Sequence, residues 1–190
     1  MLDSAVEVFA RHGYHRASVD DIADHAGISK PMVYLYFGSK EELFVACIRR
    51  EGRRLTDMLA GAVDSDDGPR RQLAGALGAF FDFVSANRGA WSVLYRQART
   101  QGAPFANEVQ EMRSRTVALT AELLGRSVNA TWPLSDPIDI AAHALVGACE
   151  SLADWLIDHP EAEAGPLTDR VLDFAWPGLS TLVAGDPSPH

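Results

Sequence analysis

Cysteine is scarce in this chain of 190 residues, and the two that occur, Cys47 and Cys149, lie far apart in the sequence. Neither belongs to a CxxC pair or to a cluster of cysteines and histidines. The sequence therefore indicates neither a disulfide framework nor a zinc module. Both cysteines are predicted to be small core residues, and neither a metal nor a cofactor is expected.

Long apolar runs are also missing. No stretch approaches the roughly 20 apolar residues that a membrane-spanning helix needs, and the N-terminus lacks a basic segment followed by an apolar one. We therefore expect a cytoplasmic protein with no membrane partner. The composition, 47% hydrophobic and 23% charged, is that of an ordinary globular protein and argues against extensive disorder.

Basic residues are outnumbered by acidic ones, 17 to 26, which gives a net charge of −9. This balance opposes DNA binding, because lysine and arginine must neutralise phosphates. The charge is unevenly distributed, however. Residues 1–54 hold as many basic as acidic groups, so the whole acidic excess belongs to the rest of the chain.

Helical periodicity runs through the sequence, whereas no segment alternates apolar and polar residues for long enough to predict a strand. Turn signals, among them Gly13, Gly27 and the stretch from Asn129 to Pro137, divide the chain into about nine helices. We expect an all-α fold whose first helix ends at Gly13.

Two short helices joined by a tight turn are predicted from Ser18 to Tyr36. Ser18 and Asp21 form an acidic capping box at the start of the first helix. Gly27 stands at the corner, where a positive φ costs glycine little, and Ser29 and Pro31 supply a cap and a rigid early position for the second helix. The side chains predicted to point inward are those of Ile22, Ala23, Ala26, Ile28, Val33 and Tyr36.

The second of these helices carries side chains that suit DNA. Between Gly27 and Lys40 there are two lysines and no acidic residue, so the segment can approach DNA despite the net charge. Lys30 can donate to guanine acceptors, and Met32 can contact a thymine methyl group. The predicted DNA-binding residues are Ser18, Ser29, Lys30, Pro31, Met32, Tyr34, Tyr36 and Lys40.

Three segments of the first quarter of the chain resemble the TetR family of one-component bacterial transcriptional regulators. They are LDSAVEVFARHGY, SVDDIADHAG and SKPMVYLYFGSKEELF, which begin at Leu2, Ser18 and Ser29. Their combination is much more specific than a generic helix-turn-helix. The chain departs from the family pattern at Met32, where a small polar residue is common, and in the absence of a basic segment before the first helix.

The resemblance implies a repressor that binds a near-palindromic operator in double-stranded DNA as a homodimer and that a small-molecule effector releases. The predicted domains are a helix-turn-helix DNA-binding domain with three helices at residues 1–45, a helical effector-binding and dimerisation domain at 46–185, and a disordered tail at 186–190. The identity of the effector stays open.

Candidate effector contacts come from apolar helical stripes with a few polar residues, the usual composition of a small-molecule site. Each apolar member is, taken alone, explained more readily as core. His143, Glu150 and Asp154 share one helix face, where they can orient a polar or cationic ligand or hold a metal, although a solvated or dimer-forming face explains them as well. The predicted effector-binding residues are Phe80, Phe81, Val84, Trp91, Leu94, Tyr95, Met112, His143, Glu150 and Trp155.

Two helices are predicted to form an isologous dimer interface, in which the same surface of each copy meets its counterpart. The resemblance implies that they are the last two helices of the chain. One offers small residues that allow close approach, and the other offers apolar ones, with Pro177 expected to kink or restart it. The two sets are Ala141, Ala144, Gly147, Ala148 and Ser151, and Val171, Leu172, Phe174, Ala175, Leu179 and Leu182.

Two other functions fit parts of the sequence. An enzyme would use Glu150, Asp154 and His143 as an acid–base or metal site, but no phosphate loop, HExxH pair or nucleophile elbow supports it. A helix-turn-helix protein-interaction module without DNA binding would explain the overall acidity and the missing basic segment.

Overall fold

A computed structural model describes residues 1–63, 66–126 and 136–184 of the chain. Over these ranges the backbone forms nine α-helices and two short segments of other helix types, without a strand, which confirms the predicted all-α fold. The helices are α1 (Leu2–Arg16), α2 (Val19–Ala26), α3 (Lys30–Phe37), α4 (Lys40–Gly61), α5 (Pro69–Ala86), α6 (Arg88–Trp91), η1 (Ser92–Gln97), η2 (Ala98–Thr100), α7 (Phe105–Arg126), α8 (Asp136–Asp158) and α9 (Ala164–Ala184).

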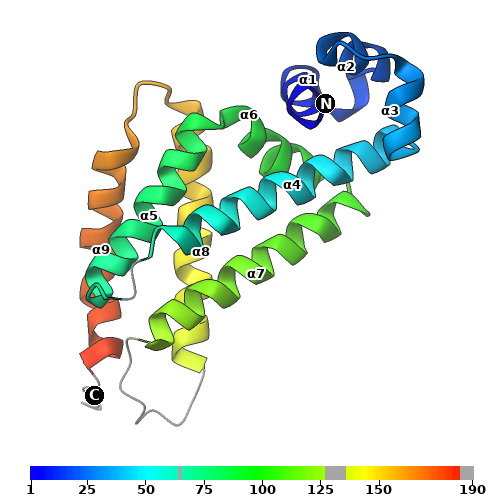
Figure 1. The fold of residues 1–190 in the computed structure, drawn as a ribbon. Helices are drawn as coiled ribbons and strands as arrows, with labels where there is room; N and C mark the ends of the chain where they lie inside the picture. The colour runs from blue at the N-terminus through cyan, green and yellow to red at the C-terminus, as the bar shows by residue number, and fades with distance from the viewer. Residues whose placement is uncertain (64–65, 127–135, 185–190) are drawn as a thin grey trace. The chain divides into compact units, whose positions relative to one another are not determined.

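The chain divides into two compact units. The first holds residues 1–54 and 87–112, and the second holds residues 55–86 with the described residues from 113 onward. Figure 1 shows α1, α2 and α3 of the first unit in blue, and α5, α8 and α9 of the second in green, yellow and orange to red. The predicted assignment of functions to residues 1–45 and 46–185 stays a prediction, and the predicted disordered tail, 186–190, lies outside the described residues.

Aromatic side chains build the core of the first unit. The Phe44 ring lies 4.8 Å from that of Phe9, 4.9 Å from Tyr14 and 4.9 Å from Phe105, measured between centroids. The pairs with Phe9 and Phe105 are edge-to-face, an arrangement that stabilises by about 0.5–1.5 kcal/mol beyond the buried area. Gln97 adds a polar tie, since its Nε2 donates to the Phe9 carbonyl at 2.9 Å. The cluster thereby fixes α1 against α4 and the start of α7.

Gly13, which was predicted to end the first helix, interrupts the helical course of α1. Gly13 has φ 75° and ψ 158°, values outside the helical region, and the chain resumes its helical course to Arg16. The Ala17 N–H then donates to the Gly13 carbonyl at 3.0 Å, which closes the last turn. Glycine here produces a kink inside α1, because it accepts a positive φ without steric cost.

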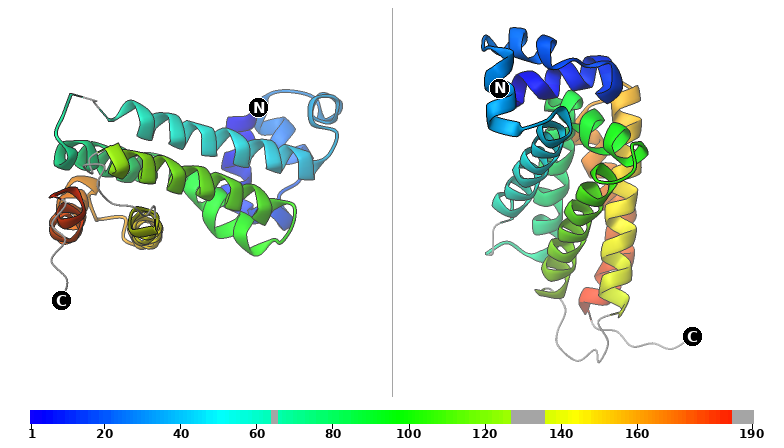
Figure 2. Two further views of the ribbon diagram at one scale, coloured as in Figure 1. Left: turned by 90° about the horizontal axis from the view of Figure 1, so that it is seen from below. Right: turned by 90° about the vertical axis from the view of Figure 1, so that its right-hand side faces the viewer.

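The second unit is organised around α5, which contacts both α8 and α9, while α8 and α9 also contact each other (Figure 1). The left view of Figure 2 shows α8 and α9 nearly end-on, side by side. The second half of α7 packs on α8 through Val117, which clusters with Ala142 and Val146. The buried side chains of α5 are Leu77, Phe80, Phe81, Phe83 and Val84.

The last two helices bear on two of the predictions. The segment Pro137–Asp158 of α8, with 22 residues, is long and apolar enough by length and composition to span a membrane, contrary to the prediction that no stretch is. A single helix of this kind is weak evidence for a membrane span, because core helices pass the same test, and α8 contacts α5, α7 and α9. Helix α9 continues through Pro177 to Ala184, so it does not restart there, and the predicted kink at Pro177 stays a prediction.

Both cysteines are buried, as predicted. Burial raises the pKa of each thiol, Cys47 and Cys149, to about 12. A thiol with such a pKa carries almost no thiolate at neutral pH and is therefore chemically inert.

Candidate functional site

The N-terminus of α2 carries the predicted capping box. The Asp21 N–H donates to the Ser18 hydroxyl oxygen at 3.0 Å, and the Ser18 N–H donates to the Asp21 carboxylate at 3.3 Å. These bonds hold the pKa of Asp21 below its ordinary value, the Ser18 hydrogen bond being the largest cause. The cap satisfies two backbone donors that a helix start leaves free. The start of the helix-turn-helix is therefore fixed locally.

The turn between α2 and α3 has the geometry predicted for Gly27. This residue is left-handed, with φ 66° and ψ 32°, and its N–H donates to the carbonyls of Ala23 and Asp24. The N–H of Ile28 also returns to the Ala23 carbonyl, at 3.0 Å. No atom lies within 4 Å of where a Cβ on Gly27 would stand, so the need for glycine is purely conformational.

Helix α3 buries one narrow side against α2. Val33 is fully buried, as predicted, and so are Ile22 and Ala23 on α2. Tyr36 was predicted to point inward but is 63% exposed, because it lies three residues past Val33, at the edge of the inward side, where the short α2 does not cover it. Ala26 and Ile28 are half-buried.

The outer side of α3 is exposed and rich in large side chains. Met32, Tyr34 and Tyr36 of the predicted set all reach the surface, as does Pro31. Leu35, 81% exposed, is missing from the predicted DNA-binding residues. The signal for it was present in the helical period, because Leu35 falls opposite Val33. Ser29 precedes α3 as its N-cap residue, but its side chain makes no capping hydrogen bond, contrary to the prediction.

The two lysines of the predicted DNA-binding set contact other parts of the same unit. Lys30 Nζ lies 2.8 Å from an Asp20 carboxylate oxygen on α2, which raises the pKa of Lys30. Lys40 Nζ donates to the His15 carbonyl at 3.2 Å and lies 4.7 Å from the centre of the Tyr14 ring. Burial lowers the pKa of Lys40. Both ammonium groups thus link α1 and α2 to the helices that follow.

The predicted apolar effector contacts are divided between the two units. In the second unit Phe80, Phe81 and Val84 are buried on α5. In the first unit the Trp91 and Tyr95 rings stack 3.7 Å apart, and Met112 is also buried. Leu94 belongs to η1, but its side chain lies outside the described residues.

The polar members of the predicted effector set do not act as one group. His143 is exposed, with its Nδ1 2.9 Å from the carbonyl of Asp139 on its own helix. Glu150 is buried instead, and the Arg113 Nε from α7 donates to its carboxylate at 3.1 Å. Arg113 was missed, because nothing in the sequence pairs residues 37 positions apart on different helices. Within the described ranges no three histidines, cysteines or acidic residues gather to hold a metal.

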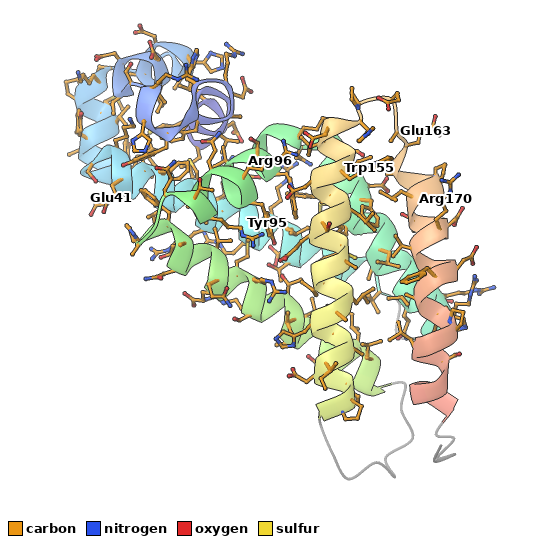
Figure 3. All side chains as sticks on the ribbon, turned by 180° about the vertical axis from the view of Figure 1, so that it is seen from behind. Glu41, Tyr95, Arg96, Trp155, Glu163 and Arg170 are labelled. Carbon is orange, nitrogen blue, oxygen red and sulfur yellow. The ribbon has the colours of Figure 1, made fainter. Side chains whose placement is uncertain are left out.

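Trp155, the last of the predicted effector contacts, lies near the C-terminal end of α8. It is 44% exposed, and its ring stacks on that of His159 with 4.2 Å between centroids. Figure 3 shows Trp155 on α8 and Arg170 on α9 towards the same end of this helix pair.

A groove of about 870 Å³ runs between α8 and α9. Small side chains from α8 form one wall, and apolar ones from α9 form the other. Phe174 stands on its α9 wall with 87% of its surface exposed, and Arg170 is the charged residue of the lining. Gly147, predicted with the small residues, lies instead near Arg113. The lining residues are Ala141, Ala144, Leu145, Ala148, Ser151, Leu152, Leu167, Arg170, Val171, Phe174, Ala175, Gly178 and Leu179.

Comparison with protein families assigns both parts of the chain. Residues 1–47 match the family model described as "Bacterial regulatory proteins, tetR family", and residues 69–178 match "Tetracyclin repressor-like, C-terminal domain". The chain belongs to the TetR family. A TetR-like transcriptional regulator from Rhodococcus sp. RHA1 is 46% identical, with a TM-score of 0.77 over 94% of this chain and 93% of that one.

More distant relatives of the TetR family share most of their length with this chain. The HTH-type transcriptional activator FasR of Mycolicibacterium smegmatis is 28% identical over 95% of this chain and 81% of its own. The structure of FadR from Bacillus subtilis in complex with stearoyl-CoA has a TM-score of 0.80 at 18% identity, over 92% of this chain and 95% of that one, and shows the shared fold. The chain is thus a DNA-binding transcriptional regulator and not an enzyme.

Proposed function

We propose that this TetR-family regulator is a repressor that binds a near-palindromic operator as a homodimer and leaves it when a small-molecule effector binds. The observation that carries the proposal is the outer side of α3, which presents Met32, Tyr34, Leu35 and Tyr36 to solvent directly after the Gly27 turn. A second helix placed in this way is the one that enters the major groove in a helix-turn-helix. Because the relatives are bacterial regulators of DNA, the proposed location is the cytoplasm.

The proposed DNA contacts divide into two kinds. The phenol groups of Tyr34 and Tyr36 donate to phosphates, and the exposed hydroxyl of Ser29 lies where the helix start faces the backbone. Lys30 and Lys40 add positive charge when phosphates compete with Asp20 and the His15 carbonyl for their ammonium groups. Ser18 and Pro31 complete the proposed set.

The groove between α8 and α9 supports the proposed dimer. An exposed phenylalanine beside a trough of alanines is an apolar surface that water solvates poorly. In a two-fold dimer the same surface serves both copies, so the Phe174 of each copy meets the groove of the other. The small side chains of Ala144 and Ala148 permit the close helix approach that such packing needs.

Dimerisation supplies the switch. Two copies related by a two-fold axis present their α3 helices roughly 34–36 Å apart, the distance between successive major grooves. An effector that favours a conformation with a different spacing lowers the DNA-competent population. By thermodynamic linkage, operator DNA must weaken effector binding by the same factor.

The effector is proposed to be a mostly apolar molecule, since the candidate contacts are dominated by buried aromatic and aliphatic side chains. The relative from Bacillus subtilis was crystallised with stearoyl-CoA, which makes a long-chain acyl-CoA the first compound to test. The proposed contacts are Phe80, Phe81, Val84, Trp91, Leu94, Tyr95, Met112, His143, Glu150 and Trp155.

Selection of bound duplexes from a random DNA pool by the full chain tests the proposed DNA recognition. We expect an enriched near-palindrome whose half-sites lie about 10 base pairs apart from centre to centre. Binding should weaken with salt and be lost in Tyr34→Ala. Failure to enrich any sequence at low salt would favour the protein-interaction module over the regulator.

Introduction of a charge into the groove tests the proposed dimer. Ala148→Glu places a carboxylate in the lining, whereas His143→Glu places one on an exposed part of the same helix outside the lining. We expect sedimentation to give a monomer for Ala148→Glu and a dimer for His143→Glu. If both variants sediment as dimers, another surface joins the two copies.

Release of the selected DNA tests the effector proposal and the direction of control. Stearoyl-CoA should release the protein in a mobility-shift titration at concentrations where coenzyme A alone does not. A reporter behind the selected operator should be silenced by the protein. Since FasR is named an activator, increased reporter output would assign that role to this chain instead.

A further inference from the structure

Apolar side chains form the centre of the outer side of α3. Successive residues of a helix are rotated by about 100°, so a residue two positions before or after Val33 points to the other side of the helix. Pro31 and Leu35 are these two residues, and they share the face opposite Val33. Val33 is fully buried and Leu35 is 81% exposed, which fixes this face as the outermost one. Met32, three residues before Leu35, extends the same apolar surface.

The hydrogen-bond donors of α3 lie to the sides of this apolar surface. Tyr34 is rotated by one residue from Leu35, and Lys30 begins the helix on the side nearer to Val33. The Lys30 ammonium group is also engaged, at 2.8 Å, by Asp20 on α2. In the proposed function phosphates compete with Asp20 for this ammonium group, so Lys30 is assigned to the DNA backbone and not to a base.

We infer that Leu35, together with Met32, reads thymine methyl groups in the operator and is the main determinant of base specificity in this regulator. Every base pair displays donors and acceptors in the major groove, but thymine alone adds a methyl group, which is the feature that an apolar side chain recognises. The inference deepens the proposed function, since it rests on α3 entering the major groove. Tyr34 and Tyr36 then orient the helix on the phosphates, while Leu35 distinguishes thymine from the other bases.

Replacement of thymine by uracil in the selected duplex tests the inference, because the change removes the methyl group and leaves base pairing intact. The full chain is titrated against the duplex and against versions carrying uracil at one thymine position at a time in each half-site. We expect one or two positions at which affinity falls about fourfold for each methyl removed, the effect of exposing one buried CH₂-sized group. Other thymine positions serve as the matched control.

The same titrations with Leu35→Ala identify the reader. This variant should bind the unmodified duplex more weakly than the parent chain and should lose its preference for thymine over uracil at the sensitive position. Leu35→Met should retain the preference. Because Leu35 is exposed in the unit, the variants should keep the parent thermal midpoint, which separates loss of reading from loss of folding.

Three results would overturn the inference. The first is an affinity unchanged by uracil at every position, the second is selected half-sites without thymine, and the third is full uracil sensitivity in Leu35→Ala. Each of these results assigns specificity to other contacts while DNA binding itself stands. Absence of any selected DNA would overturn the proposed function together with the inference. The two failures are therefore distinguishable.

Discussion

Two surfaces of this protein expose large apolar side chains, the outer side of α3 and the groove between α8 and α9, and they differ in what surrounds those side chains. On α3, Leu35 is flanked by phenol hydroxyls and lies on one short helix. Along the groove, Phe174 is flanked by alanines and leucines from two long helices. A single helix with donors suits a polar groove in DNA, whereas a trough lined mostly by alanine and other apolar side chains, with Ser151 and Arg170 as its polar members, suits a second apolar surface. Exposure alone does not identify a partner; the neighbouring donors do.

Phe174→Glu should produce the largest effect, a loss of dimerisation, and it tests most clearly whether the two surfaces have different partners. A carboxylate at the centre of an apolar interface should weaken dimerisation by about 100-fold or more, since central aromatic residues dominate interface energies. Sedimentation equilibrium measures the change, and Phe174→Leu is the control that should remain dimeric. Tyr34→Ala should lose DNA binding while its dimer stays intact. If Tyr34→Ala lost the dimer as well, the two surfaces would not be separate.

Glu150→Ala should destabilise the second unit by about 3 kcal/mol, the lower end of the range for breaking a buried ion pair, because Arg113 keeps part of its surface in water. Urea unfolding measures the loss. Glu163→Ala, at an exposed position, should cost nothing measurable. The double variant Arg113→Leu with Glu150→Leu should recover most of the stability. A failure to recover it would show that the Arg113–Glu150 pair stabilises the unit beyond neutralising its own buried charges.

Gly27→Ala should affect the DNA-binding surface of α3 and leave the dimer surface between α8 and α9 unchanged. A left-handed φ costs a residue with a Cβ about 1–2 kcal/mol, and no steric clash adds to this at Gly27. We expect a matching loss of stability and weaker operator binding with an unchanged dimer. Gly27→Asn, which tolerates the left-handed conformation, is the control and should lie close to the parent. An equal loss in both variants would contradict a purely conformational requirement.

Ser18→Ala should give the smallest effect, about 1 kcal/mol, by removing the cap of α2. Ser29→Ala is its matched control, because Ser29 begins a helix without a side-chain cap. The pKa of Asp21 is lowered from 3.8 in the folded protein, so the stability from this pair is present above the unfolded pKa and is lost as pH falls through the folded one. The difference between parent and Ser18→Ala should therefore narrow in acid.

Local chemistry predicted the α2–α3 region well. The Ser18–Asp21 capping box, the positive φ of Gly27 and the burial of Val33 all follow from residues close together in sequence, and the structure confirms each. The predictions failed where distant segments decide the outcome. Arg113 reaches Glu150 from another helix, and no pattern within α8 reveals it.

Leu35 shows a different kind of failure. Its position opposite Val33 was available from the helical period, but Leu35 was not included among the predicted DNA-binding residues. Tyr36 was predicted both to point inward and to contact DNA, and its exposed position agrees only with the second prediction. For α3, the burial of Val33 was predicted, whereas the exposure of Leu35 was not.

The mass of the complex between the full chain and its selected duplex tests the central claim most directly, that one surface binds DNA and the other joins two copies. Native mass spectrometry of the parent chain should give two chains per duplex, and Phe174→Glu should give little complex at the same concentration. One chain per duplex, or undiminished binding by Phe174→Glu, would contradict the account.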